Sequence, residues 1–151
     1  FHRVRDAGLH VTIHAGEVLG PESVWSAISD LGAERIGHGY RSVEDPSLVE
    51  YLAEWEIGLE CCPTSNLHIS AIADYASHPI KPLADAGVMF CLNTDDPGIS
   101  NIDIAHEYDV AAPAVGLTPE QVQQSQRDAL AMAFLAEDDK QALLQKAAKR
   151  T

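Results

Sequence analysis

The residues best suited to chemistry lie in four short polar clusters. They are His14-Ala15-Gly16-Glu17, His38-Gly39, Cys62-Pro63-Thr64-Ser65-Asn66 and Asn93-Thr94-Asp95-Asp96. Imidazole nitrogens and carboxylate oxygens bind divalent metals, and they also accept and donate protons. If the fold brings these side chains together, the chemistry that they suit best is metal-assisted hydrolysis.

Each cluster directly follows a short apolar run typical of a β-strand. The sequence predicts strands at 9–14, 35–38, 57–62 and 88–93. Between them, apolar residues at helical spacing and stop signals predict helices at 21–31, 46–55 and 82–86. Three further helical patterns follow the last strand, at 101–115, 119–134 and 138–149.

This alternation of strands and helices predicts an α/β fold with a parallel sheet. The carboxyl ends of parallel strands open on one face of such a fold, so the four clusters are expected to converge there. An open doubly wound sheet and a segment of a (β/α)8 barrel both fit the pattern. A whole barrel needs about 250 residues, so a chain of 151 residues corresponds to about half of one.

The two histidines of the first strand cannot share a metal ion. His10 and His14 lie on the same face, but four residues of strand separate them by roughly 13 Å. His14 lies at the end of the strand where sites form. We therefore interpret His10 as a structural residue of the opposite end.

Each cluster also has an ordinary structural interpretation. Glu17 could be a solvated loop carboxylate, and His38 could occupy a tight turn between two glycines. Asp96 before Pro97 is typical of a helix cap, and Ser65-Asn66 is expected to cap the next helix. The hypothesis of a metal-hydrolase face depends on all four strand ends together.

Composition excludes several classes of protein. Hydrophobic residues make up 46% of the chain, which is enough for a folded core, and no apolar run reaches the roughly 20 residues of a membrane span. With 10 Lys and Arg against 23 Asp and Glu, the net charge is -13. The basic residues cluster only near the end of the sequence, at Lys146, Lys149 and Arg150. Cations are common in the last turn of a helix, where they complement the helix dipole. Nucleic-acid and anionic-membrane partners are therefore not expected.

Cysteine usage and helix patterns give two further expectations. Cys61, Cys62 and Cys91 lie in apolar stretches without paired CxxC spacing, and we interpret them as buried free thiols of a cytoplasmic protein. Trp25 and Trp55 fall at apolar positions of helices and are expected to face the core.

The motifs resemble those of a known family. HAGE at 14–17, GHG at 37–39, CPTSN at 62–66 and NTDDPG at 93–98 are similar to the second half of adenosine deaminases, zinc enzymes of the amidohydrolase type. The run HEYDVAAPAVGLTPEQ at 106–121 resembles the bacterial members in particular. The resemblance covers essentially the whole chain. It implies strands five to eight of a TIM-like (β/α)8 barrel plus C-terminal helices, with one zinc ion per complete barrel.

The resemblance also implies roles for individual residues. His14 and Asp95 resemble two zinc ligands, and Glu17 resembles the residue that protonates purine N1. His38 resembles the histidine beside the water that zinc activates, and Asp96 resembles the aspartate at the N7 edge of the purine. The implied reaction is hydrolytic deamination of adenosine and 2'-deoxyadenosine to the inosines, with release of ammonia. In that reaction Glu17 must be protonated, so a raised pKa is expected for it.

The sequence departs from the family in one respect: it has no His-x-His pair, which supplies two further zinc ligands in the family. The chain starts at Phe1, and we expect residues 1–151 to be the C-terminal part of one barrel domain that lacks its N-terminal half. We expect this chain alone to bind zinc weakly and to be inactive, since catalytic zinc normally has three protein ligands. Its expected partners are a purine nucleoside and either the missing half or a second copy.

Two alternatives remain open. The substrate could be adenine or another adenine nucleoside, because most residues that would choose the substrate are absent. The chain could instead be an inert half-barrel that associates through exposed strand edges.

Overall fold

Four parallel strands form one sheet in the computed structural model, which describes residues 1–149. The strands are β1 (Thr12–Ala15), β2 (Arg35–His38), β3 (Gly58–Cys61) and β4 (Phe90–Leu92). They lie in the order β1-β2-β3-β4, so neighbours in sequence are also neighbours in the sheet. A doubly wound sheet reverses its strand order at a switch point, whereas a barrel does not. The observed order is therefore that of a barrel segment.

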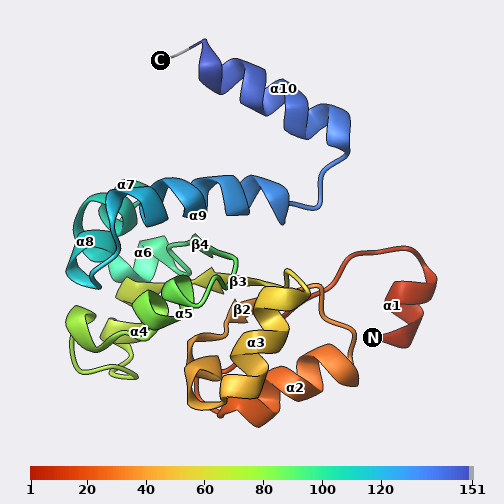
Figure 1. Cartoon of the computed structure of the whole chain (residues 1–151), viewed down its shortest axis with the longest axis horizontal. Coiled ribbons are helices and arrows are strands. Elements are labelled where there is room, and N and C mark those ends of the chain that lie inside the picture. Colours follow the sequence, from red (N-terminus) through yellow and green to blue (C-terminus); the bar gives the residue numbers. More distant parts are fainter. Residues whose placement is uncertain (150–151) are drawn as a thin grey trace.

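Helices separate and follow the strands (Figure 1). Before β3 they are α1 (His2–Asp6), α2 (Pro21–Ser29) and α3 (Pro46–Glu54). After β3 they are α4 (Pro63–His68), α5 (Ile80–Asp85), α6 (Pro97–Ser100), α7 (Ile104–His106), α8 (Ala112–Ala114), α9 (Pro119–Ala131) and α10 (Glu137–Ala148). Shorter turns are 3-10 helices at Tyr40–Glu44 and Tyr75–Ser77 and a π-helix at Glu107–Ala111.

The register of the sheet sorts its side chains onto two faces. Ile13, Ile36, Leu59 and Phe90 pair across the four strands, and the last three are almost completely buried. This row belongs to the core, together with Leu48 and Leu52 of α3 and Leu83 of α5. The next row contains His14, Gly37, Glu60 and Cys91. Since side chains alternate along a strand, this second row lies on the opposite face.

The amino end of the sheet is held by contacts remote from the polar clusters. His10 Nδ1 lies 2.8 Å from Glu34 Oε2, and its ring stacks on Phe134 at 4.3 Å between centroids. The guanidinium of Arg35 lies 3.7 Å from the centre of the same Phe134 ring. His10 thus has the structural role predicted for it.

The four predicted strands are present in the predicted order, but the described residues form more helices than the sequence predicted, and several bounds differ. The strand predicted at 9–14 begins at Thr12, and the helix predicted at 101–115 is divided. Asp103 starts α7 by accepting a hydrogen bond from the His106 amide at 3.0 Å, and the π-helical turn follows. The last helix ends at Ala148, and Arg150 lies outside the described residues.

The tryptophan prediction is half wrong. Trp25 is partly buried and donates from Nε1 to Asp45 Oδ2 at 2.9 Å. Trp55 is 63% exposed because α3 ends at Glu54, one residue before it. Its ring stacks on Tyr51. The prediction of buried free thiols is confirmed, because Cys61, Cys62 and Cys91 are all free and buried. Burial raises the pKa of each thiol.

Candidate active site

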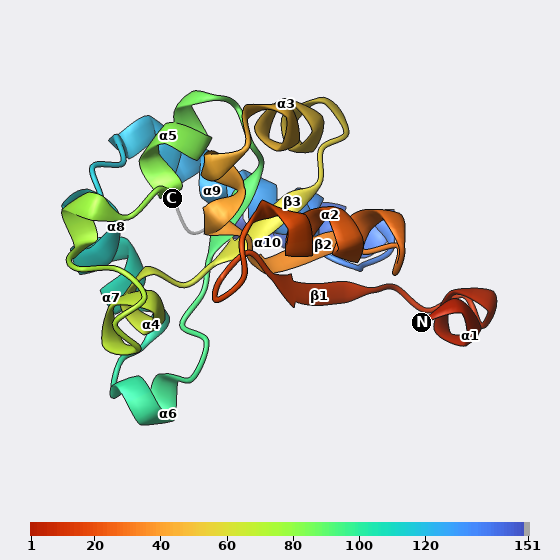
Figure 2. The same cartoon turned by 90° about the horizontal axis from the view of Figure 1, so that it is seen from below.

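The carboxyl ends of the strands lie on the side of the sheet where α4, α6 and α7 gather (Figure 2). A cavity of about 300 Å³ opens there. Its lining consists of His14, Gly37, His38, Glu60, Cys62, Asn93, Thr94, Asp95 and Ile104. Each of the four sequence clusters therefore contributes at least one residue to the lining of this cavity.

His14 reaches this cavity from the end of β1, and Gly37 makes room for its ring. A Cβ atom on Gly37 would lie 3.0 Å from His14 Nε2 and still closer to Cδ2. The rings of His14 and His38 lie edge to face, with 5.0 Å between their centroids. The glycine before His38 thus has a specific packing reason, which is the approach of His14 from the neighbouring strand.

His38 ends β2 in an unusual backbone conformation. Its φ is 63°, and Gly39 after it has φ 68°. Non-glycine residues in this left-handed region are uncommon and concentrate at functional sites. His38 is only 3% exposed, and burial lowers its pKa although the nearby Glu17 carboxylate opposes that effect.

Glu17 lies beside His38 at the start of a loop, where two hydrogen bonds hold the backbone on either side of it. Ser23 Oγ accepts from the Gly16 amide at 2.9 Å, and the Tyr40 hydroxyl donates to the Glu17 carbonyl at 3.0 Å. The Glu17 Oε1 atom is 3.5 Å from His38 Nδ1 and accepts from Asn66 Nδ2 at 2.9 Å. Its carboxyl group is therefore fixed beside the cavity rather than free in a solvated loop.

The two aspartates after β4 are placed differently. Asp95 has φ 59°, and its Oδ2 accepts from Ser65 Oγ at 2.7 Å. Asp96 precedes α6, and its carbonyl accepts from the amides of Ile99 and Ser100. Asp96 therefore occupies the N-cap position, as predicted, but its side chain makes no capping hydrogen bond. Asp95 lines the cavity, whereas Asp96 is next to it but outside the lining.

The expectation that Ser65-Asn66 caps a helix is wrong. The helix α4 already begins at Pro63, so both residues lie inside it and their side chains are available for other contacts. Ser65 binds Asp95, and Asn66 binds Glu17 and approaches His38 Nδ1 at 3.3 Å. The signal for Asn66 in the sequence was its place in the CPTSN cluster that follows the third strand.

The chain supplies suitable metal donors but too few of them. An imidazole nitrogen of His14 and a carboxylate oxygen of Asp95 are donors that zinc prefers, and both side chains are exposed in one cavity. Within residues 1–149, no group of three or more His, Cys, Asp or Glu side chains is arranged to hold a metal ion. These donors are of the types that zinc prefers, and two of them fall short of the three protein ligands of a usual catalytic zinc site.

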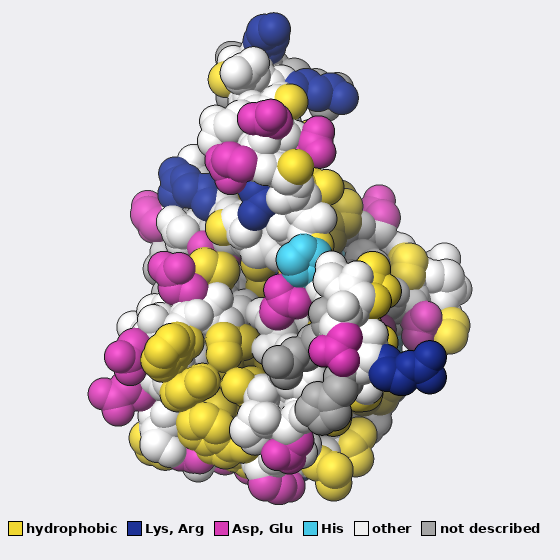
Figure 3. All heavy atoms as spheres, turned by 90° about the vertical axis from the view of Figure 1, so that its right-hand side faces the viewer, with side chains coloured by type: hydrophobic (Ala, Val, Ile, Leu, Met, Phe, Trp, Pro, Cys, Tyr) yellow, Lys and Arg dark blue, Asp and Glu magenta, His cyan; other side chains and the backbone are white. Residues whose placement is uncertain are grey.

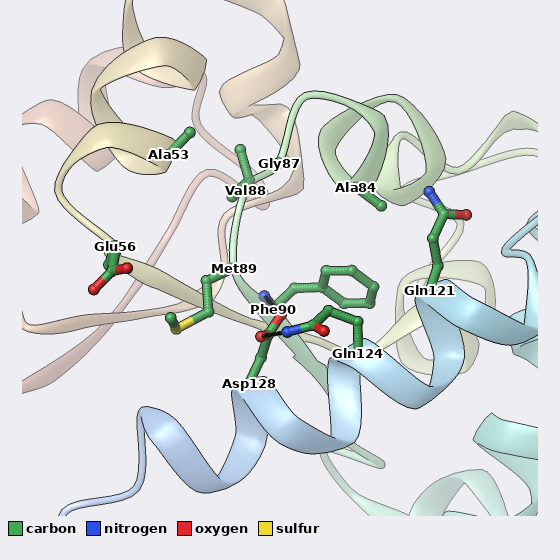
Figure 4. A pocket seen from close by; sticks show the side chains of 10 residues that line it. All are labelled: Ala53, Glu56, Ala84, Gly87, Val88, Met89, Phe90, Gln121, Gln124 and Asp128. Atoms are coloured by element: carbon green, nitrogen blue, oxygen red, sulfur yellow. Dashed lines mark hydrogen bonds between the residues drawn. The ribbon is translucent and has the colours of Figure 1, made fainter.

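A second cavity, of about 250 Å³, lies at the opposite end of β4 (Figure 4). Gln124 and Asp128 project into it from α9 toward Phe90. Asp128 accepts from Gln124 Nε2 at 2.7 Å and from the Phe90 amide at 3.3 Å. Because these bonds already engage its carboxylate in joining α9 to β4, we regard this cavity as a packing feature.

Acidic residues outnumber basic ones in the chain by 23 to 10. On the face shown in Figure 3, Lys and Arg occur in small separate groups among many Asp and Glu side chains. In the part of the chain that the structure describes, no helix has the length and apolar character needed to cross a bilayer.

Comparison with known proteins agrees with this arrangement. The sequence model of the family described as Adenosine deaminase matches residues 1–150. An adenosine deaminase of Klebsiella pneumoniae is 56% identical over 149 residues, which are 99% of this chain and 45% of that protein. The chain thus spans under half the length of the curated relatives that it matches.

Solved structures give the same result for the fold. An adenine deaminase from Arthrobacter aurescens superposes with a TM-score of 0.91 at 26% identity, over 98% of this chain and 45% of the other. An amidohydrolase from Burkholderia ambifaria with bound Zn superposes with a TM-score of 0.87 at 27% identity, over 97% and 41%. The sheet and its helices correspond to part of a barrel of this type.

Proposed function

The chain belongs to the adenosine deaminase family, and we propose that it forms the C-terminal half of a barrel that hydrolyses adenosine and 2'-deoxyadenosine to inosine and 2'-deoxyinosine. The barrel completed by an N-terminal half is called the complete enzyme below. The observation that carries this proposal is the cluster of Glu17, His38 and Asn66 beside the cavity that His14 and Asp95 line.

His14 and Asp95 would hold a zinc ion together with ligands from the N-terminal half. When bound, zinc lowers the pKa of a water molecule to about 7 and so supplies a nucleophile at neutral pH. The donor types of this chain and the bound Zn of the Burkholderia relative support zinc as the metal.

The residues of this chain would act on the purine and the water. Glu17 would donate a proton to N1, which makes C6 electron-poor enough for attack. His38, buried and neutral, would orient the attacking water and accept its proton. Asp96 would meet the N7 edge, and it must carry a proton to donate there because a carboxylate only accepts. Water adds at C6 and ammonia leaves, so adenosine and water give inosine and ammonia.

The substrate assignment rests on the relatives. Curated relatives at 56% identity are named adenosine deaminase, whereas the adenine deaminase is 26% identical. A phosphorylated substrate is less favoured, because no Arg or Lys is among the residues that line the site cavity.

The test is an assay of the complete enzyme with adenosine, 2'-deoxyadenosine and adenine, followed by ultraviolet absorbance. We expect zinc-dependent conversion of both nucleosides and little conversion of adenine. Glu17→Gln should abolish turnover and leave folding intact, since the amide has the same shape but no acidic proton. A zinc-loaded, folded wild-type enzyme that leaves both nucleosides unchanged would contradict the proposal.

For the chain alone we propose a second behaviour, association through its strand edges. In the described sheet, β1 and β4 each pair with one neighbour only, and the inner face exposes Thr12 and His14. Open edges and uncovered sheet faces promote pairing with another chain. Size-exclusion mass of the chain should therefore exceed that of a 16.3 kDa monomer, and a monomeric elution would exclude this behaviour.

A further inference from the structure

A buried chain of hydrogen bonds connects a backbone amide to the proposed acid Glu17. The Ile80 amide donates to His78 Nδ1 at 3.1 Å, and His78 Nε2 lies 3.3 Å from Asn66 Oδ1. Asn66 Nδ2 then donates to Glu17 Oε1 at 2.9 Å. Asn66 is 0% exposed and His78 is 2% exposed, so water does not compete for these bonds.

The Ile80 amide determines which atoms donate and which accept along this series of hydrogen bonds. A backbone N–H can only donate, so Nδ1 of His78 must accept and a neutral ring carries its proton on Nε2. Burial, assisted by the nearby His38, lowers the pKa of His78 to about 4, which keeps the ring neutral. His78 therefore donates to Asn66, and the atom that receives this bond must be the amide oxygen.

Fixing the oxygen of Asn66 also fixes its nitrogen. The NH2 group points away from His78, toward Glu17 Oε1 and His38 Nδ1 at 2.9 and 3.3 Å. An amide without His78 could rotate and place its oxygen against the Glu17 carboxyl group. The acidic proton of Glu17 could then bond to that oxygen instead of staying on Oε2, and Glu17 would lose its donor.

The contacts of Glu17 also distinguish its two oxygens. Asn66 and His38 both approach Oε1, and none of the hydrogen bonds described for residues 1–149 reaches Oε2. An oxygen that already accepts a hydrogen bond from N–H is a poor place for a proton. The proton that Glu17 must deliver is therefore directed to Oε2.

We propose that Asn66 and His78 are positioning residues for the deamination, an inference that rests on the proposed function. Asn66 holds the carboxyl group of Glu17 with its proton on Oε2, and His78 keeps the Asn66 amide in the orientation that does so. Neither residue lines the cavity of the site, and both are buried. Their removal should lower the rate of the chemical step and leave substrate affinity nearly unchanged.

The first experiment measures kcat and KM for adenosine on the complete enzyme. Asn66→Ala should lower kcat about 10- to 100-fold, because Glu17 becomes a carboxylate as it gives up its proton and the lost hydrogen bond is then one to a charged group. KM should change less than about threefold. Ser125→Ala is the control, because Ser125 is also 0% exposed and hydrogen-bonded but lies in α9, away from the site. It should keep wild-type kcat. A folded Asn66→Ala enzyme with wild-type kcat, or with a change in KM alone, would overturn the proposal.

Two substitutions at position 78 separate positioning from local folding. The side-chain amide of His78→Gln can reach Asn66 as Nε2 does, whereas His78→Asn can accept from the Ile80 amide as Nδ1 does but is too short to reach Asn66. We expect His78→Gln to keep kcat within about threefold and His78→Asn to lose about tenfold. Equal losses in both variants at equal thermal stability would refute the role of His78.

A spectroscopic readout is independent of turnover. In the 15N NMR spectrum of the complete enzyme at pH 7, His78 should be neutral with its proton on Nε2. A proton on Nδ1 would contradict the proposed donor and acceptor order of these hydrogen bonds.

An inactive wild-type enzyme would instead refute the proposed function, and with it any catalytic role of the hydrogen bonds from His78 to Glu17. An active wild type with an unaffected Asn66→Ala variant refutes positioning alone.

Discussion

Ser65 Oγ donates a 2.7 Å hydrogen bond to Oδ2 of Asp95, and so connects the start of α4 to the loop after β4. Asp95 is exposed and has a left-handed backbone, so few other contacts fix its carboxylate. The bond engages Oδ2, and Asp95 lines the cavity. A serine that was interpreted from sequence as a helix cap therefore orients a proposed metal ligand.

The first prediction follows from this bond. Ser65→Ala should weaken zinc binding to the complete enzyme about 10- to 100-fold, the usual effect of removing a partner of a metal ligand. Competition with a chromogenic chelator measures this affinity. Ser125→Ala, which also removes a buried hydroxyl, should bind zinc like the wild type. Unchanged zinc affinity in Ser65→Ala would show that the bond does not orient the ligand.

The second prediction concerns the glycine that makes room for His14. In Gly37→Ala, the new methyl group would overlap the His14 ring and displace it from the cavity. We expect a loss of roughly 1–3 kcal/mol in the free energy of unfolding, the usual result of overpacking, together with weaker zinc binding. Denaturant unfolding and the chelator assay measure the two effects.

Gly98→Ala is the matched control for that change. A Cβ atom on Gly98 would meet nothing within 4 Å, and its backbone does not require glycine. Its stability and zinc affinity should stay close to those of the wild type. If Gly37→Ala were as well tolerated as Gly98→Ala, the packing explanation for the GHG motif would be wrong.

The third prediction is a pH dependence of stability. Burial holds the pKa of His78 at about 4 in the folded protein, against 6.5 for the ordinary side chain. Between these values the unfolded chain binds more protons, so stability rises with pH and is lost as the pH falls from 6.5 toward 4. The pKa difference corresponds to about 3 kcal/mol at full effect.

A variant isolates this contribution from those of other groups. His78→Gln cannot titrate, so its free energy of unfolding should fall less than that of the wild type between pH 7 and pH 4.5. Urea unfolding of the complete enzyme at both pH values gives the difference. Parallel decreases in the two proteins would exclude His78 as the source.

The sequence predicted the fold well because its signals are local. Apolar runs of strand length end in polar clusters, and Asp45 before Pro46 caps α3 as expected, accepting from the amides of Ser47 and Leu48. The residues alone did not decide between a barrel segment and a doubly wound sheet. That choice depends on strand order, and strand order comes from packing between segments far apart in the sequence.

The site was predictable only in part for the same reason. His14 and Asp95 lie where strand ends predict them, in one cavity. The bond from Asn66 to Glu17 joins residues 49 positions apart, and no spacing rule indicates it. His78 lies in the connection between α4 and α5, far from any strand end, so no local pattern marks it.

The fourth prediction concerns zinc and the number of its ligands. The described part of this chain offers His14 and Asp95 but no group of three donors, whereas catalytic zinc normally has three protein ligands and a water. The 151-residue chain should therefore bind zinc weakly and leave adenosine unchanged. Addition of the corresponding N-terminal half, with its His-x-His strand, should restore both zinc binding and turnover. The His14→Ala chain with the same added half should stay inactive, because one ligand is then missing. Zinc-dependent turnover by the chain alone would contradict this prediction. It would mean either that two donors suffice or that a second copy of the chain supplies the other ligands. The mass of the active species in size exclusion would distinguish a monomer from such a dimer.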